Sequence, residues 1–194
     1  DTKIYEGKIP ANYPLVMGHE IVGEVIDGDT NGFAKPGARV LVDPVLYCGT
    51  CFHCKQGDTN LCPNGGIMGR EVNGGFADYC IAKTSHIYPL PDELDSKTGA
   101  AIQVLTTVLH AQNKGNLTKG DAVIVSGLGV TGLMHIQLAK ARGAKVVVGT
   151  SRNAHKREMA LALGADYAVG HGEEAKKTIL EVTKGIGADM VIEC

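Results

Sequence analysis

The chain has 194 residues, with 19 lysines and arginines against 21 aspartates and glutamates and a formal net charge of −2 at pH 7. This balance argues against a general nucleic-acid or anionic-membrane partner, because both attract a basic surface. No apolar run approaches the roughly 20 residues that a membrane-spanning helix needs, and no signal peptide opens the sequence. Free thiols at metal-ligand spacing favour a reducing compartment, and we therefore expect a cytoplasmic protein.

The first half of the chain, residues 1–95, is predicted to form short strands interrupted by glycine and proline. Apolar and polar residues alternate over 21–26, 39–42 and 77–82, the pattern of strands with one buried face. Turn-forming residues separate these runs. We therefore expect an irregular all-β unit in this half.

A four-cysteine motif with the spacing C-x2-C-x2-C-x7-C lies within this half. Its members are Cys48, Cys51, Cys54 and Cys62. A tight turn at Gly49 can bring two sulfurs together, and a thiolate from the following loop can close a tetrahedron with Zn–S bonds of about 2.3 Å. A closed all-thiolate shell leaves no position for a substrate, so this zinc would be structural. The alternatives are disulfides, an iron–sulfur cluster or unrelated thiols.

The second half of the chain is predicted to alternate between helix and strand. A first helix is expected over 96–113, with Ser96 as its N-cap. The expected strands are 122–126, 145–149, 167–169 and 189–193, and the expected helices are 130–142, 153–163 and 173–184. This βαβ rhythm predicts an open parallel sheet.

A glycine-rich turn with the pattern G-x-G-x-x-G joins the first of these strands to its helix. The first glycine permits a tight turn, the second lets backbone amides approach a pyrophosphate, and the third allows close helix packing. The phosphates would lie at the positive end of the helix dipole. We therefore expect a dinucleotide here, the alternative being a glycine-rich connection without function. The residues expected to bind it are Gly127, Leu128, Gly129, Val130 and Gly132.

The end of the next predicted strand indicates which dinucleotide fits. An NAD-binding unit usually has Asp or Glu about 20 residues after the turn, to hold the ribose hydroxyls. Residues 148–156 contain no acid. Ser151 can hydrogen-bond a 2′-phosphate, Arg152 can bind it through two nitrogens, and Lys156 can reach it as a point charge. This segment favours NADP(H) over NAD, the alternative being a solvated basic helix start.

Together these segments resemble the zinc-containing medium-chain alcohol dehydrogenase family, and within it the polyol and threonine dehydrogenase branch. Residues 17–25 are similar to the family's G-H-E-x-x-G motif, and residues 35–40 to its K-x-G-D-R-V strand entry. The four cysteines, the segment 74–79 and the glycine-rich turn then follow in the family's order.

The resemblance implies an α/β protein of two domains. A GroES-like catalytic domain with a structural-zinc lobe would span 1–95. A linking helix and a partial Rossmann domain, with a doubly wound parallel sheet, would span 96–194. The family's first zinc ligand, a cysteine, would lie upstream of Asp1, and the sequence stops directly after a predicted strand. We therefore expect a fragment that lacks both ends of a longer enzyme.

The resemblance also implies a second, catalytic zinc. His19 would be its imidazole ligand, and Glu20 would be the carboxylate beside it. Gln103 stands where the family has Cys, Glu or Asp, and a neutral amide is a poorer zinc ligand than a thiolate or carboxylate. A glutamine hydrogen-bonded to backbone is the alternative at that position.

The implied function is that of a zinc-dependent oxidoreductase which transfers hydride between NADP(H) and a small alcohol, aldehyde or ketone. The fragment itself is expected to be poorly active, and the parent enzyme to be a homodimer or homotetramer without nucleic-acid or membrane partners. Two alternatives stay open. One is a zinc-independent enzyme like the quinone and enoyl reductases, which Gln103 suggests. The other is a non-catalytic NADP-binding module with a structural zinc lobe.

Overall fold

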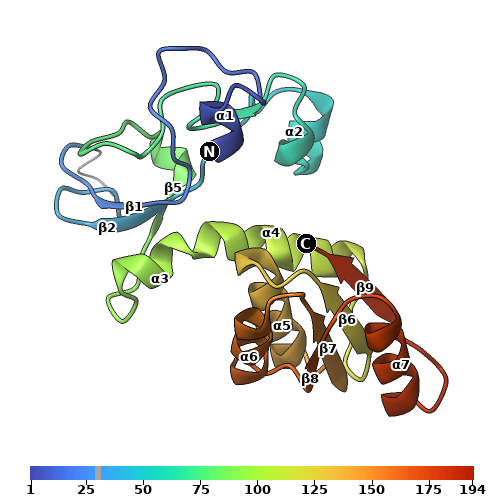
Figure 1. Cartoon of the computed structure of the whole chain (residues 1–194). Helices are drawn as coiled ribbons and strands as arrows, with labels where there is room; N and C mark the ends of the chain where they lie inside the picture. Colours follow the sequence, from blue (N-terminus) through green and yellow to red (C-terminus); the bar gives the residue numbers. More distant parts are fainter. Residues whose placement is uncertain (29–31) are drawn as a thin grey trace. The chain divides into compact units, whose positions relative to one another are not determined.

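The computed structural model describes residues 1–28 and 32–194. The chain divides into two compact units, Asp1–Gln103 and Val104–Cys194 (Figure 1). None of the helices in the described part of the chain has the length and apolarity to cross a bilayer.

The first unit is built from short strands and short helices. Strands β1 (Ile21–Glu24), β2 (Arg39–Val42) and β5 (Ile87–Pro89) form an antiparallel sheet in the order β1-β2-β5, and β3 (Val45–Leu46) pairs with β4 (Gly66–Ile67). The helices are α1 (Thr2–Tyr5), α2 (Phe52–Gln56), α3 (Ser96–Ala100) and the 3-10 turns η1 (Thr59–Leu61) and η2 (Thr84–His86). Ile21, Val42 and Met68 form a small buried core in this unit. This is the irregular β unit expected from the sequence.

One predicted strand of this unit, residues 77–82, is wrong. Backbone hydrogen bonds instead involve the residues just before this segment. Gly74 N donates to Val16 O (2.7 Å), and Phe76 N donates to Met17 O (2.9 Å). Beyond Phe76 the segment runs along the surface, with Ile81 94% exposed. Among the described residues, no strand pairs with this segment, so its alternating pattern forms no ladder.

The helix predicted over 96–113 is two helices, α3 and α4 (Ile102–Lys114), separated at Ala101. The predicted N-cap is also wrong by one residue. The Asp95 carboxylate accepts hydrogen bonds from Lys97 N (2.9 Å) and Thr98 N (3.0 Å). Asp95 is the cap because its backbone is still extended, whereas Ser96 is already helical.

The second unit contains the expected parallel sheet. Strands β6 (Ala122–Ser126), β7 (Val146–Thr150), β8 (Tyr167–Val169) and β9 (Met190–Glu193) lie in the order β8-β7-β6-β9. The helices are α5 (Val130–Ala141), α6 (Ala154–Ala162) and α7 (Glu173–Val182). The predicted elements are confirmed, with ends shifted by one or two residues.

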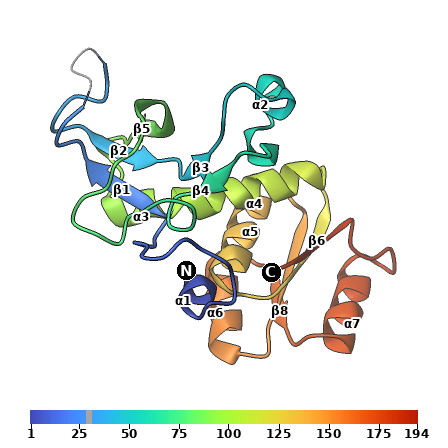
Figure 2. The ribbon, with the colours of Figure 1, turned by 90° about the horizontal axis from the view of Figure 1, so that it is seen from above.

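The helices of this unit cover both faces of the sheet (Figure 2). Val123, Val125 and Val147 pack on one face against Ile136 of α5 and Ala160 of α6. On the opposite face, Ala122 and Val148 pack against Ile179 of α7. The chain runs outward from β6 to β8 and then returns to the other side of β6. In an open parallel sheet, this reversal point is where ligands bind, beyond the carboxyl ends of the strands.

Candidate functional site

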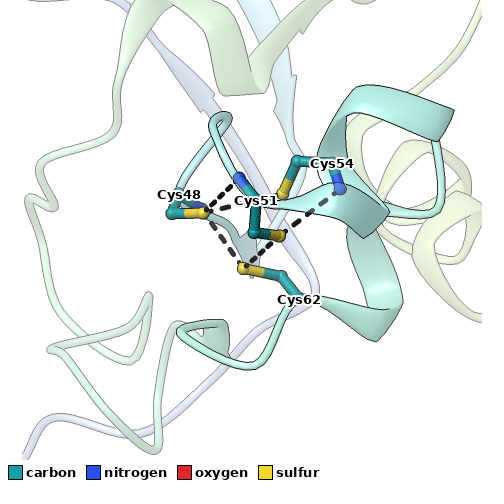
Figure 3. A group of neighbouring side chains, drawn as sticks. All are labelled: Cys48, Cys51, Cys54 and Cys62. Atoms are coloured by element: carbon teal, nitrogen blue, oxygen red, sulfur yellow. Dashed lines mark hydrogen bonds between the residues drawn. The ribbon is translucent and has the colours of Figure 1, made fainter.

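Four sulfurs meet in one loop of the first unit (Figure 3). Cys48 precedes α2, Cys51 is its N-cap, Cys54 lies in its first turn, and Cys62 follows η1. Their Sγ atoms all lie within 4.8 Å of one another, and the Cys48–Cys54 and Cys51–Cys62 pairs are 3.9 Å apart. Zn–S bonds of 2.3 Å in a tetrahedron place the sulfurs about 3.8 Å apart. The four thiols therefore fit a zinc ion.

Backbone amides point at these sulfurs. Cys51 N donates to Cys48 Sγ (3.4 Å), Cys54 N to Cys51 Sγ (3.5 Å), and Cys48 N to Cys62 Sγ (3.4 Å). Such donors stabilise thiolates, the form that binds a metal. Hydrogen bonds from Thr50 lower the pKa of Cys48 to about 5, whereas desolvation raises the pKa of Cys54 to about 12. All six cysteines of the chain are free.

His19 lies in a separate pocket of about 410 Å³ within the same unit. Residues 1–4, Ile9, His19 and the loop 67–70 line this pocket. The Nδ1 atom of His19 is 3.4 Å from the Asp1 carboxylate, and Gly18 N donates to the same carboxylate oxygen (3.3 Å). This contact orients the ring, so Nε2 is the nitrogen left to bind a metal.

Glycines hold the His19 segment against the loop 67–70 and the segment 73–76. Gly18 has φ +97°, and a Cβ at Gly69 would lie 2.8 Å from Gly18 N. A Cβ at Gly74 would collide with Gly18 O. The close backbone approach that seats His19 therefore requires glycine at 69 and 74.

The other two residues expected near a catalytic metal lie elsewhere. Glu20 is exposed, and Gln103 is the half-buried second residue of α4. Neither lines the His19 pocket. Within the described residues, the four cysteines are the sole group of at least three His, Cys, Asp or Glu side chains that could hold a metal. Metal binding by His19, Glu20 and Gln103 stays a prediction.

The glycine-rich turn lies at the reversal point of the parallel sheet. Gly127 has φ +96° and donates its N–H to Thr150 O (3.1 Å), which ties the turn to the end of β7. A Cβ at Gly132 would collide with Gly127 O, whereas a Cβ at Gly129 would meet no atom within 4 Å. Gly132 therefore packs the helix against the turn, and Gly129 leaves open space at the start of α5. Leu128 is buried and anchors the turn in the core, and Val130 is exposed.

The basic segment after β7 lies at the same edge of the sheet. Ser151 is buried, whereas Arg152 and Lys156 are exposed. Asn153 is the N-cap of α6, where its side chain accepts from Lys156 N (3.2 Å).

Two residues that the sequence did not indicate also lie here. Arg157 donates to Ser151 O (2.7 Å) and Arg152 O (3.1 Å), and His171 Nδ1 is 2.9 Å from Thr150 Oγ1. In the sequence, Arg157 could have been found from its position one helical turn after the N-cap Asn153. From there a long side chain can reach back to the end of β7. No pattern pointed to His171, which arrives from the end of β8.

Comparison with known proteins gives two family matches. The model of the alcohol dehydrogenase GroES-like domain matches residues 1–92, and that of the zinc-binding dehydrogenases matches residues 130–194. A sorbitol dehydrogenase from Halalkalibacterium halodurans is 37% identical over all of this chain and 58% of its own length. A D-arabitol-phosphate dehydrogenase from Enterococcus avium is 37% identical over 93% of this chain and 53% of its own length. The chain thus spans about half the length of these curated relatives.

Comparison with solved structures also gives dehydrogenases. A zinc-binding dehydrogenase from Sinorhizobium meliloti 1021, bound to NADP, is 33% identical and superposes with a TM-score of 0.89 over 99% of this chain and 57% of its own. An alcohol dehydrogenase from Escherichia coli CFT073, in complex with NADH, is 31% identical with a TM-score of 0.89, over 100% of this chain and 57% of its own.

Proposed function

Since this chain belongs to the zinc-binding alcohol dehydrogenase family, we propose that the protein containing it is an oxidoreductase that exchanges hydride between NADP(H) and a small alcohol, aldehyde or ketone. Residues 1–95 would form its GroES-like catalytic domain, and residues 96–194 the linking helix and part of its Rossmann domain. The observation that carries the proposal is the glycine-rich turn at the reversal point of a parallel sheet, with open space above Gly129.

The cofactor would lie along this edge of the second unit. The amides of the turn and the start of α5 would hold the pyrophosphate. Ser151, Arg152 and Lys156 would hold the 2′-phosphate that distinguishes NADP from NAD. Arg157 would act indirectly, because its guanidinium already binds two backbone carbonyls and fixes the shape of the strand end.

Two zinc sites would serve different purposes. The four cysteines would bind a structural zinc that holds their loop. When bound at His19, a catalytic zinc supplies a Lewis acid for the substrate oxygen. Asp1 would keep the His19 ring in its binding orientation, since it contacts Nδ1 and leaves Nε2 available. Glu20 and Gln103 do not line the His19 pocket, and we propose them as further ligands of that zinc only in the whole protein.

The relatives act, by their names, on different substrates: one on sorbitol and another on a phosphorylated polyol. Family membership alone therefore leaves the substrate class open. We also propose a cytoplasmic protein without nucleic-acid partners, as the balanced charge and the free thiols suggest. Family membership adds the proposal that the parent enzyme is a homodimer or homotetramer.

Elemental analysis and cofactor titration test the proposal on the 194-residue chain. After a chelator wash the chain should retain at least one zinc, which Cys51→Ser should lose and Cys80→Ser, at an exposed thiol outside the motif, should keep. Fluorescence titration should show tighter binding of NADPH than of NADH, and Arg152→Gln should abolish the difference. A chain that binds neither dinucleotide would refute the proposed function.

A further inference from the structure

His171 lies where two neighbouring strands of the parallel sheet end. Strands β7 and β8 are paired up to Thr150 and Val169. The ladder continues for one more bond, because Ser151 N donates to Val169 O (3.0 Å). Arg152 and His171 each stand two residues beyond the last register pair. Both therefore emerge at the same end of adjacent strands, which lie about 4.8 Å apart.

The imidazole of His171 is held over the end of β7. Its Nδ1 atom is 2.9 Å from the hydroxyl oxygen of Thr150. Thr150 is buried and immediately precedes Ser151, so this hydroxyl is a fixed point of the strand end. Among the described residues, Nε2 of His171 makes no hydrogen bond, and the residue as a whole is exposed. One ring nitrogen is thus anchored, and the other is available to a ligand.

The Thr150 hydroxyl allows Nε2 to be a donor. A hydroxyl both donates and accepts, so it can donate to Nδ1 of His171 and leave the ring proton on Nε2. In that tautomer Nε2 carries an N–H group that can donate to a ligand. The opposite tautomer would present a lone pair at Nε2, which an anion repels. A phosphate bound at this position therefore selects the donor form.

The acidic residues that follow His171 are engaged by other groups. Glu174 Oε2 accepts a hydrogen bond from Gly170 N (2.8 Å), which supports the backbone of this turn. The carboxylate of Glu173 lies 3.8 Å from the Lys176 ammonium. Neither carboxylate contacts the imidazole, so neither competes with a ligand for Nε2.

We propose that His171 is a further cofactor-binding residue, which donates from Nε2 to the 2′-phosphate of NADP(H). The inference rests on the proposed function, in which Ser151, Arg152 and Lys156 hold the same phosphate. Those three groups come from the end of β7 and the first turn of α6. His171 would approach from the neighbouring strand β8, so that the phosphate is held between two strand ends.

A donor at this position would act on the choice of cofactor more than on its overall affinity. NAD has a hydroxyl where NADP has the 2′-phosphate, and a hydrogen bond to a charged group contributes more than one to a neutral group. His171 is therefore a specificity-determining residue in this proposal, with its ring oriented by Thr150.

Calorimetric titration of the 194-residue chain with 2′,5′-ADP and 5′-AMP tests the proposal, because these probes differ only in the 2′-phosphate. The wild-type chain should bind 2′,5′-ADP more tightly than 5′-AMP. His171→Phe keeps a flat ring and removes both nitrogens, so it should lower the affinity for 2′,5′-ADP about tenfold and leave that for 5′-AMP unchanged. His171→Gln keeps an N–H donor and should lose less.

The matched control is His155→Phe, at an exposed imidazole of α6 whose Nδ1 faces Glu158 (3.8 Å). It should leave both affinities unchanged. The inference is overturned by an unchanged affinity of His171→Phe for 2′,5′-ADP, by an equal loss in His171→Gln, or by an equal loss in the control. An equal loss of both probes in His171→Phe also overturns it, because the ring would then be a surface for adenine.

NADPH titration of the wild-type chain keeps this inference separate from the proposed function. In each of those cases, NADPH binding by the wild-type chain leaves the proposed function standing. A wild-type chain that binds neither the two probes nor a dinucleotide would refute the proposed function itself.

Discussion

Replacing Gly129 by alanine would separate cofactor binding from folding in the glycine-rich turn. Gly129 has φ −77° and ψ −171°, an extended conformation that alanine also adopts, and an added Cβ would meet no atom within 4 Å. Alanine is a poorer N-cap than glycine, but it lowers the entropy of the unfolded chain by an amount worth about 0.4–1 kcal/mol. These effects nearly cancel, so the free energy of unfolding should change by no more than about 0.5 kcal/mol.

The effect on the cofactor should be much larger. The new methyl group would occupy the open space in which the pyrophosphate approaches the amides at the start of α5. Losing one hydrogen bond to a charged phosphate costs roughly 1.5–3 kcal/mol, which weakens NADPH binding at least tenfold.

Gly132→Ala is the contrasting variant. Its Cβ would collide with the carbonyl oxygen of Gly127, which is backbone and cannot rotate away. Forcing the turn and α5 apart costs about 1–3 kcal/mol, and the better helix propensity of alanine recovers up to about 1 kcal/mol of this. Gly132→Ala should therefore weaken both folding and NADPH binding.

Urea unfolding and NADPH fluorescence titration on the three proteins measure both quantities. We expect Gly129→Ala to unfold at the wild-type urea concentration and to bind NADPH at least tenfold more weakly. Unchanged NADPH affinity in Gly129→Ala would refute it, because the turn would then not receive the phosphates. A large loss of stability in Gly129→Ala would refute the open space at Gly129, and unchanged stability in Gly132→Ala would refute the packing role of Gly132.

Three further outcomes are expected. At pH 6.5, iodoacetamide should modify Cys48 of the zinc-free chain before Cys54 and the reference thiol Cys80. The pKa of Cys48 is lowered to about 5, whereas the pKa values of Cys54 and Cys80 are raised. The reverse order of modification in mass spectrometry would contradict this expectation. Ile136→Ala, at a fully buried site, should lower the free energy of unfolding by about 2–5 kcal/mol in urea titration, and a loss below about 1 kcal/mol would contradict the packing. Burial lowers the pKa of His135, so the folded state favours the neutral ring and stability should fall as pH drops below about 6.5. His135→Gln should flatten that fall in thermal melts between about pH 7 and 5. An unchanged slope of stability against pH would contradict this role of His135.

Much of the architecture could be predicted because its signals are local. The spacing of the four cysteines limits where their sulfurs can go, and the structure brings all four within 4.8 Å. The glycine-rich turn, placed between an apolar strand and a helix, likewise specifies a parallel sheet with the turn at its edge. The strand predicted over 77–82 failed because an alternating pattern forms a strand only when a partner strand lies beside it.

Tertiary structure alone decided what surrounds His19. Asp1, Lys3 and Arg70 carry no sequence pattern that connects them with one another, yet they line one pocket because glycines at 69 and 74 let separate backbone segments pack in close contact. Arg157 and His171 similarly reach the end of β7 from a helix and from another strand. Spacing along the chain fixes which atoms a short segment can bring together, whereas contacts between distant segments depend on how the whole unit packs.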